Sequence, residues 1–182
     1  MIFFRKYILN RMLKSKLRNS EREKSFKSLK DIKSVLVLFD TKDFIEAEEF
    51  IEQLKKLKKK TTVCAFIGRG DMTHYSETNI NFIREKDTKN WNDRMMLKTT
   101  SIANNDYFDM VVNFSLKPNI ILEYILASVN SPFKTGFYKS DLKVHDFIIS
   151  SASTSSDEIV PPDLRELGAQ LLFYLKTIAP GE

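Results

Sequence analysis

Hydrophobic residues are grouped into short runs separated by charged segments, and three of these runs predict buried strands. The runs cover residues 32–39 (IKSVLVLF), 61–67 (TTVCAFI) and 107–114 (YFDMVVNF). Short apolar and β-branched runs bounded by polar residues are typical of strands buried on both faces of a parallel sheet. Residues 80–84, 133–138 and 144–149 predict further short strands.

Apolar residues at three- and four-residue steps predict helices between the strands. The clearest helix follows Asp43, because Glu46 lies three residues on at capping-box spacing and an apolar stripe extends to Leu57. Pro118 begins a second helix, and a third follows Pro161-Pro162 after a Ser-rich loop. Strands that alternate with helices predict an α/β fold with a Rossmann-like, mostly parallel sheet flanked by helices.

The N-terminal segment differs from the rest in composition. Residues 3–30 contain no Gly or Pro and many Leu, Lys, Arg and Glu, which predicts one long helix. We therefore expect a basic N-terminal helix over residues 1–31 and a single Rossmann-like domain over residues 32–182.

Positive charge is concentrated in this segment. The net charge of the chain is +5, but residues 1–34 contain eleven basic and three acidic side chains, which gives +8 there and −3 for the remainder. Such asymmetry indicates a polyanionic partner or an anionic membrane surface. The candidate nucleic-acid-binding residues are Arg5, Lys6, Arg11, Lys14, Lys16, Arg18 and Arg22.

Three interpretations of the basic helix stay open. It packs its apolar half on the domain and leaves a solvated basic rim, or it grips the phosphates of RNA. In the third, it lies on an anionic membrane with Phe3 and Phe4 inserted. The first is compatible with either of the others. No motif that reads a DNA sequence is present.

Polar side chains also follow the predicted strands, where open α/β sheets bind ligands. Asp40, Arg69, Asp71 and Ser115 are the candidate ligand-binding residues. They form no recognisable catalytic set or metal site. The glycines at 68 and 70 follow the second strand rather than the first, and no phosphate-binding loop is present, so no cofactor is predicted.

The compartment is predicted from cysteine use and hydropathy. Cys64 is the single cysteine and lies inside an apolar run, so no intramolecular disulfide can form. No apolar run approaches the length of a membrane span, and the charged residues near the start interrupt any signal-peptide core. We expect a cytoplasmic protein.

Four segments together resemble an uncharacterised domain-of-unknown-function family found in Bacteroidota. They are residues 87–91 (DTKNW), 108–115 (FDMVVNFS), 122–125 (LEYI) and 133–136 (FKTG). The resemblance implies a fold but no activity. A more distant similarity is to the N-terminal half of heptosyltransferase-type glycosyltransferases, carried by residues 109–114, the helix after Pro118 and residues 134–137 (KTGF). The nucleotide-sugar-binding second half of those enzymes has no counterpart in this sequence, so the similarity does not imply transferase activity.

The leading hypothesis from the sequence is a non-catalytic binding or accessory protein that engages RNA or a ribonucleoprotein through its basic N-terminal helix. The alternative is a small enzyme or binding module for a nucleotide or sugar phosphate at the strand ends. A peripheral membrane protein is the third hypothesis.

Overall fold

The computed structural model describes residues 2–18, 22–68, 79–84, 107–150 and 163–177, which include a six-stranded parallel sheet. Its strands lie in the order β3-β2-β1-β4-β5-β6 and have these bounds: β1 Ser34–Asp40, β2 Lys60–Ile67, β3 Ile80–Arg84, β4 Met110–Asn113, β5 Lys134–Gly136 and β6 Phe147–Ile148. The order changes direction between β1 and β4, which makes their carboxyl ends the topological switch point of a doubly wound sheet. The predicted fold class is confirmed.

The strands occupy the predicted places, and some are shorter than their apolar runs. The run at 107–114 forms a ladder only over β4, although Phe108 and Phe114 on either side are buried. An apolar run indicates that its residues are buried, whereas a β-strand also requires backbone hydrogen bonds to a neighbouring strand. Residues 80–84 form β3 as predicted.

Helix α2 (Phe44–Lys56) connects β1 to β2, helix α4 (Ile120–Ser128) connects β4 to β5, and helix α5 (Leu164–Thr177) follows β6. The Asn119 side chain caps α4 by accepting from the Ile121 N–H at 3.0 Å. Asp43 is the N-cap of α2, but its side chain makes no cap hydrogen bond, so the expected capping box is incomplete. A short 3₁₀ turn, η1 (Thr41–Asp43), precedes α2 instead.

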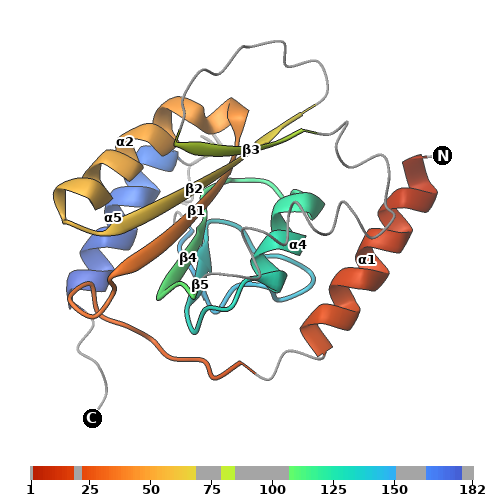
Figure 1. The fold of residues 1–182 in the computed structure, drawn as a ribbon, viewed down its shortest axis with the longest axis horizontal. Coiled ribbons are helices and arrows are strands. Elements are labelled where there is room, and N and C mark those ends of the chain that lie inside the picture. The colour runs from red at the N-terminus through yellow and green to blue at the C-terminus, as the bar shows by residue number, and fades with distance from the viewer. Residues whose placement is uncertain (1, 19–21, 69–78, 85–106, 151–162, 178–182) are drawn as a thin grey trace, which may run out of the picture.

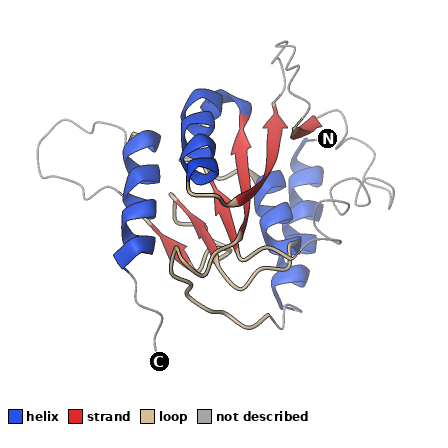
Figure 2. Ribbon diagram, turned by 60° about the vertical axis from the view of Figure 1, so that its left-hand side comes forward, coloured by secondary structure: helices blue, strands red, loops and turns tan. Residues whose placement is uncertain are grey.

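Helices cover both faces of the sheet (Figures 1 and 2). Side chains of β1 alternate between the faces: Val35, Val37 and Phe39 pack in the cluster with α2 and α5, whereas Leu36 and Leu38 pack in the cluster with α4. Strands buried on both faces need such continuous apolar sequences. None of the helices in the described ranges combines the length and apolar character that crossing a bilayer requires.

The N-terminal helix is shorter than the sequence predicts. Helix α1 covers Ile2–Arg18, and residues 22–28 have no regular secondary structure. Residues 22–31, here called the strap, are held to the body by backbone hydrogen bonds from Ser25 to Pro132 and from Leu29 to Leu175. These tertiary hydrogen bonds replace helical ones, so the high helix propensity of the segment is overridden.

Candidate functional site

Helix α1 packs its apolar side on the body. Leu9 and Leu13 are buried in the cluster that contains Leu122 and Ile125 of α4, and Lys16 lies over the ring of Tyr124 at 5.8 Å. The first of the three interpretations, an apolar half on the domain with a basic rim, describes this arrangement.

The basic rim consists of exposed side chains. Arg11, Lys14 and Arg18 are exposed, and their spacing of three and four residues places them along one side of the helix. None of them makes an ion pair within the described part of the chain. Arg5 and Lys6 belong to α1, but their side chains lie outside the described residues.

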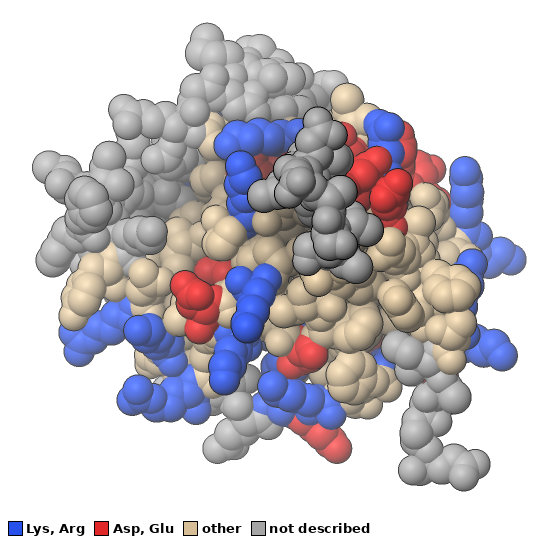
Figure 3. Space-filling view, turned by 180° about the vertical axis from the view of Figure 1, so that it is seen from behind, with Lys and Arg blue, Asp and Glu red and all other residues tan. Residues whose placement is uncertain are grey.

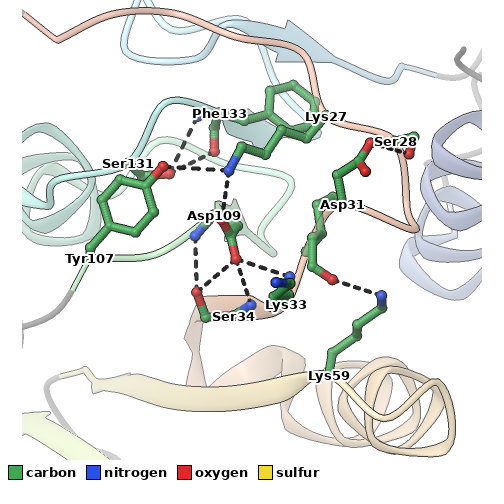
Figure 4. A network of polar contacts seen from close by, with 11 residues as sticks. Lys27, Ser28, Asp31, Lys33, Ser34, Lys59, Tyr107, Asp109, Ser131 and Phe133 are labelled. Atoms are coloured by element: carbon green, nitrogen blue, oxygen red, sulfur yellow. Dashed lines mark hydrogen bonds and ion pairs between the residues drawn. The ribbon is translucent and has the colours of Figure 1, made fainter. Parts of the chain in front are cut away.

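The strap neutralises its own positive charge against the body. Arg22 donates to Asp146 at 2.6 Å and to the carbonyls of Ser131 and Pro132 at 3.2 Å each. Lys27 donates to Asp109 at 2.6 Å (Figure 4). Arg22 was expected among the nucleic-acid-binding residues; because these contacts fix its guanidinium against the body, we leave it out of the binding face proposed below.

Two of the four candidate residues at the strand ends lie next to each other. Asp40 ends β1, and Ser115 follows β4 with 3% exposure. The Asn119 amide donates to Asp40 at 3.4 Å and so joins α4 to this edge. The other two candidates, at positions 69 and 71, lie outside the described residues.

Asp43 is a further acidic group at this edge that the sequence did not single out as a ligand. Burial raises its pKa to about 6, and the charges of Asp40 and Glu46 act in the same direction. Ser115 acts on the pKa of this carboxyl in the opposite direction, although its buried hydroxyl makes no hydrogen bond in the described part of the chain. Within the described residues, no three His, Cys, Asp or Glu side chains are grouped in a way that could hold a metal ion.

A cavity of about 730 Å³ lies between α1, the start of α4 and the loop after β5. Lys14 contributes from α1, and Lys139 and Ser140 contribute from the loop. Asn119 and Glu123 line the side formed by α4. The cavity therefore joins the basic rim of α1 to the carboxyl side of the sheet.

A second hollow of about 330 Å³ adjoins this cavity. It shares Lys139 and Ser140 with the cavity and adds Lys24, Lys143 and the ring of Phe26. Phe26 is 54% exposed, although it contacts Phe133 and Phe147. The hollow thus offers lysines beside an accessible aromatic ring.

A buried polar network supports the cavity from below. Glu123 is 4% exposed, and its Oε1 accepts from the Tyr138 hydroxyl at 3.1 Å. The Asn113 amide donates to the same hydroxyl at 2.9 Å. Burial raises the pKa of Tyr138, and the neighbouring Glu123 charge raises it further, so the phenol stays protonated and donates.

Sequence reasoning missed Lys139, Lys143 and Glu123. Both lysines follow a predicted strand, so the rule that ligands bind at strand ends would have included them had it been applied to this strand. Glu123 stands among apolar residues of a predicted helix, and an acidic residue on a buried stripe is itself a signal.

A family model matches residues 5–178, and its description reads "Family of unknown function (DUF6913)". The chain belongs to this family. The resemblance to a domain-of-unknown-function family, which four sequence segments indicated, is therefore confirmed. No curated protein matches the DUF6913 chain in sequence.

A solved structure shares the fold of this DUF6913 protein. It is described as the crystal structure of the glycosyl transferase family 9 from Veillonella parvula DSM 2008, with a TM-score of 0.50 and 14% sequence identity. The match covers 81% of this chain and 42% of that chain, so this chain spans less than half of its length. At this identity the likeness shows the fold alone, and it agrees with the Rossmann-like half that the sequence resembles.

Proposed function

We propose that this protein binds RNA, free or in a ribonucleoprotein, through a basic face made of Arg11, Lys14, Arg18, Lys139 and Lys143. The observation that carries the proposal is that Lys14 and Lys139, far apart in the sequence, line one cavity while both stay exposed. Positive charge from two separate segments is therefore gathered on one surface.

The spacing of the basic face supports contact with a chain of phosphates. Arg11 and Arg18 are seven residues apart on α1, which corresponds to about 10 Å. Lys14 continues this row to Lys139 across the cavity, and Lys143 lies beyond Lys139 in the second hollow. Seen from behind, Lys and Arg gather along the lower left of the surface (Figure 3).

Accessibility of the charge is the second support. The acidic partners Asp109 and Asp146 pair with strap residues, whereas the five residues of the basic face make no ion pair within the described ranges. Unpaired cations can release counterions from a polyanion. Phe26 in the second hollow offers a ring on which an unpaired base could stack.

Binding of a short single-stranded RNA across a salt series tests the proposal. If all five cations contact phosphates, log K falls with log salt with a slope of about −3 to −4. Filter binding between about 50 and 200 mM KCl measures this slope. Absent binding, or affinity that does not change with salt, would refute RNA binding through the basic face.

Membrane attachment has weaker support. Leu9 and Leu13 are turned into the body, so this apolar side of α1 is not available to a bilayer. Attachment would instead need Phe3 and Phe4, whose side chains lie outside the described residues. Co-flotation with anionic vesicles would favour the membrane over RNA. A cytoplasmic location stays a prediction that goes with the RNA proposal.

A further inference from the structure

We infer that the cavity between α1, α4 and the loop after β5 binds a sugar phosphate, with Glu123 accepting a hydrogen bond from a sugar hydroxyl beside the phosphate. If the sugar phosphate is part of RNA, the inference rests on the proposed function and specifies its site. If the sugar phosphate is a free ligand, the inference does not depend on RNA binding. The volume of about 730 Å³ lies within the usual range for small-ligand sites.

Positive groups converge on one part of the cavity. Lys14 and Lys139 are exposed cations from α1 and the loop, and the same loop also contributes the exposed carboxylate of Asp141. Asn119 and Ile120 form the start of the nine-residue helix α4. The N-terminal backbone N–H groups of a helix attract an anion. The Asn119 side chain caps one of these donors, the Ile121 N–H, which leaves the first N–H groups of the helix available.

Glu123 makes the cavity more than a simple anion site. Its Oε1 is held by the Tyr138 hydroxyl, and its Oε2 accepts no hydrogen bond from any residue of the described part, although the side chain lines the cavity. A carboxylate only accepts hydrogen bonds and repels a phosphate. A ligand that suits both ends of the cavity therefore carries a hydroxyl donor next to its phosphate.

The buried network fixes this acceptor in place. The Tyr138 hydroxyl donates to the carboxylate, the Asn113 amide donates to that hydroxyl, and Glu123 itself is 4% exposed. Ser140, which is 5% exposed and whose hydroxyl accepts from the Leu142 N–H, contributes a further hydroxyl to the cavity wall. The cations would bind the phosphate of a phosphorylated polyol, and the carboxylate and the hydroxyl side chain would form hydrogen bonds with its hydroxyl groups.

Calorimetric titration with ribose 5-phosphate and with inorganic phosphate tests the inference. The native protein should bind ribose 5-phosphate about tenfold or more tightly than phosphate, because the hydroxyl adds a hydrogen bond to a charged acceptor. In Glu123→Gln the two affinities should converge: ribose 5-phosphate weakens and phosphate strengthens, since a like charge is removed. Glu166→Gln, an exposed change on α5, is the matched control and should alter neither.

A purely structural role for Glu123 would move both affinities in the same direction, and that result would overturn the inference. Equal native affinity for the two probes would overturn it as well. Should Glu123→Gln fail to fold, the exposed changes Lys14→Gln and Lys139→Gln should each weaken both probes severalfold. Unchanged affinities in these variants would be equally decisive against the site.

A second arm separates the two sources of the sugar phosphate. If RNA supplies it, a short RNA competes with ribose 5-phosphate and binds better than DNA of the same sequence, because DNA lacks the 2′-hydroxyl. If the ligand is free, RNA and ribose 5-phosphate still compete for Lys14 and Lys139, but RNA binds no better than DNA of the same sequence and Glu123→Gln leaves RNA affinity unchanged. RNA binding without any binding of ribose 5-phosphate would reject this inference and leave the proposed function standing.

Discussion

Lys27 donates to Asp109 Oδ1 at 2.6 Å, and this contact ties the strap to the start of β4. The other oxygen of Asp109 accepts from the backbone N–H groups of Lys33 and Ser34 and from the Ser34 hydroxyl (Figure 4). Burial opposes the charged carboxylate, but Lys27 and these hydrogen bonds outweigh it and lower the pKa of Asp109 to about 2. An acidic residue within the segment that resembles glycosyltransferases thus has a structural role here.

Replacing Asp109 should destabilise the protein. Asp109→Asn removes the negative charge that Lys27 and the two N–H groups share, so we expect the free energy of unfolding at pH 7 to fall by about 2 kcal/mol. The carboxylate stabilises fully above its unfolded pKa near 3.8, and this contribution is lost as pH falls towards 2. Urea unfolding should show the native and variant curves converging over that range.

The control for this change is Asp141→Asn, because Asp141 is an exposed acidic side chain with no hydrogen bond or ion pair in the described part of the chain. It should leave the free energy of unfolding unchanged within about 0.5 kcal/mol. Equal losses in both variants would show that Asp109 does not anchor the strap.

His145 should make stability depend on pH above this range. Burial lowers its pKa to about 4, although Asp146 acts in the opposite direction. In the unfolded chain His145 takes up a proton near pH 6.5, whereas in the folded chain it stays neutral until the pH approaches 4. Stability therefore falls as pH drops from 6.5 towards 4. Between pH 7 and 5.5 the native protein should lose about 1 kcal/mol through this residue. In His145→Gln that loss should be absent, and an unchanged pH dependence would contradict the assignment.

The contact between Gly136 and His145 predicts a rescue experiment. A Cβ atom at position 136 would lie 2.5 Å from His145 Nε2, closer than packed atoms approach. Gly136→Ala should therefore cost about 1–3 kcal/mol of unfolding free energy. Adding His145→Ala removes the obstructing ring, so a double-mutant cycle should show that the alanine costs much less in that background. If Gly136→Ala destabilised the His145→Ala background as much as the native protein, the clash with the His145 ring would not be the cause.

Substitutions in the strap should lower stability without changing RNA affinity, and substitutions in the basic face should lower RNA affinity without changing stability. Arg22→Gln breaks the contacts to Asp146 and to the carbonyls, so we expect a loss of about 1–3 kcal/mol in stability and RNA affinity within twofold of native. Lys14→Gln should do the reverse, because its exposed side chain stabilises nothing in the described structure. Thermal melts and filter binding on both variants provide the comparison. Loss of RNA affinity in Arg22→Gln would return this residue to the binding surface.

The strands and the helices that link them could be predicted from sequence because burial imposes a visible pattern. Residues 35–39 are buried on both faces, and this constraint leaves a continuous apolar run. The stripe from Phe44 to Leu54 likewise records packing of α2 on the sheet. Where one local pattern and the tertiary environment agree, sequence alone is sufficient.

The strap and the cavity could not be predicted in this way because each depends on long-range contacts. Residues 22–31 contain good helix formers, yet the segment is not helical, and its cations pair with Asp109 and Asp146, which lie more than seventy residues away. Lys14 and Lys139 line the same cavity only because α1 packs on α4. No local sequence pattern predicts that two distant residues line one cavity. The positive charge of the N-terminal segment could therefore be predicted, but not which of its cations form ion pairs with the body and which stay unpaired.

The most direct test of the account compares the salt dependence of RNA binding in two double variants with equal loss of charge. Lys14→Gln/Lys139→Gln removes two cations of the basic face, and Lys56→Gln/Lys176→Gln removes two exposed cations from α2 and α5 on the other face of the sheet. The first should reduce the magnitude of the slope of log K against log salt by about 1.4, and the second should leave it as in the native protein. The same slope in both double variants would contradict an RNA-binding surface on the basic face.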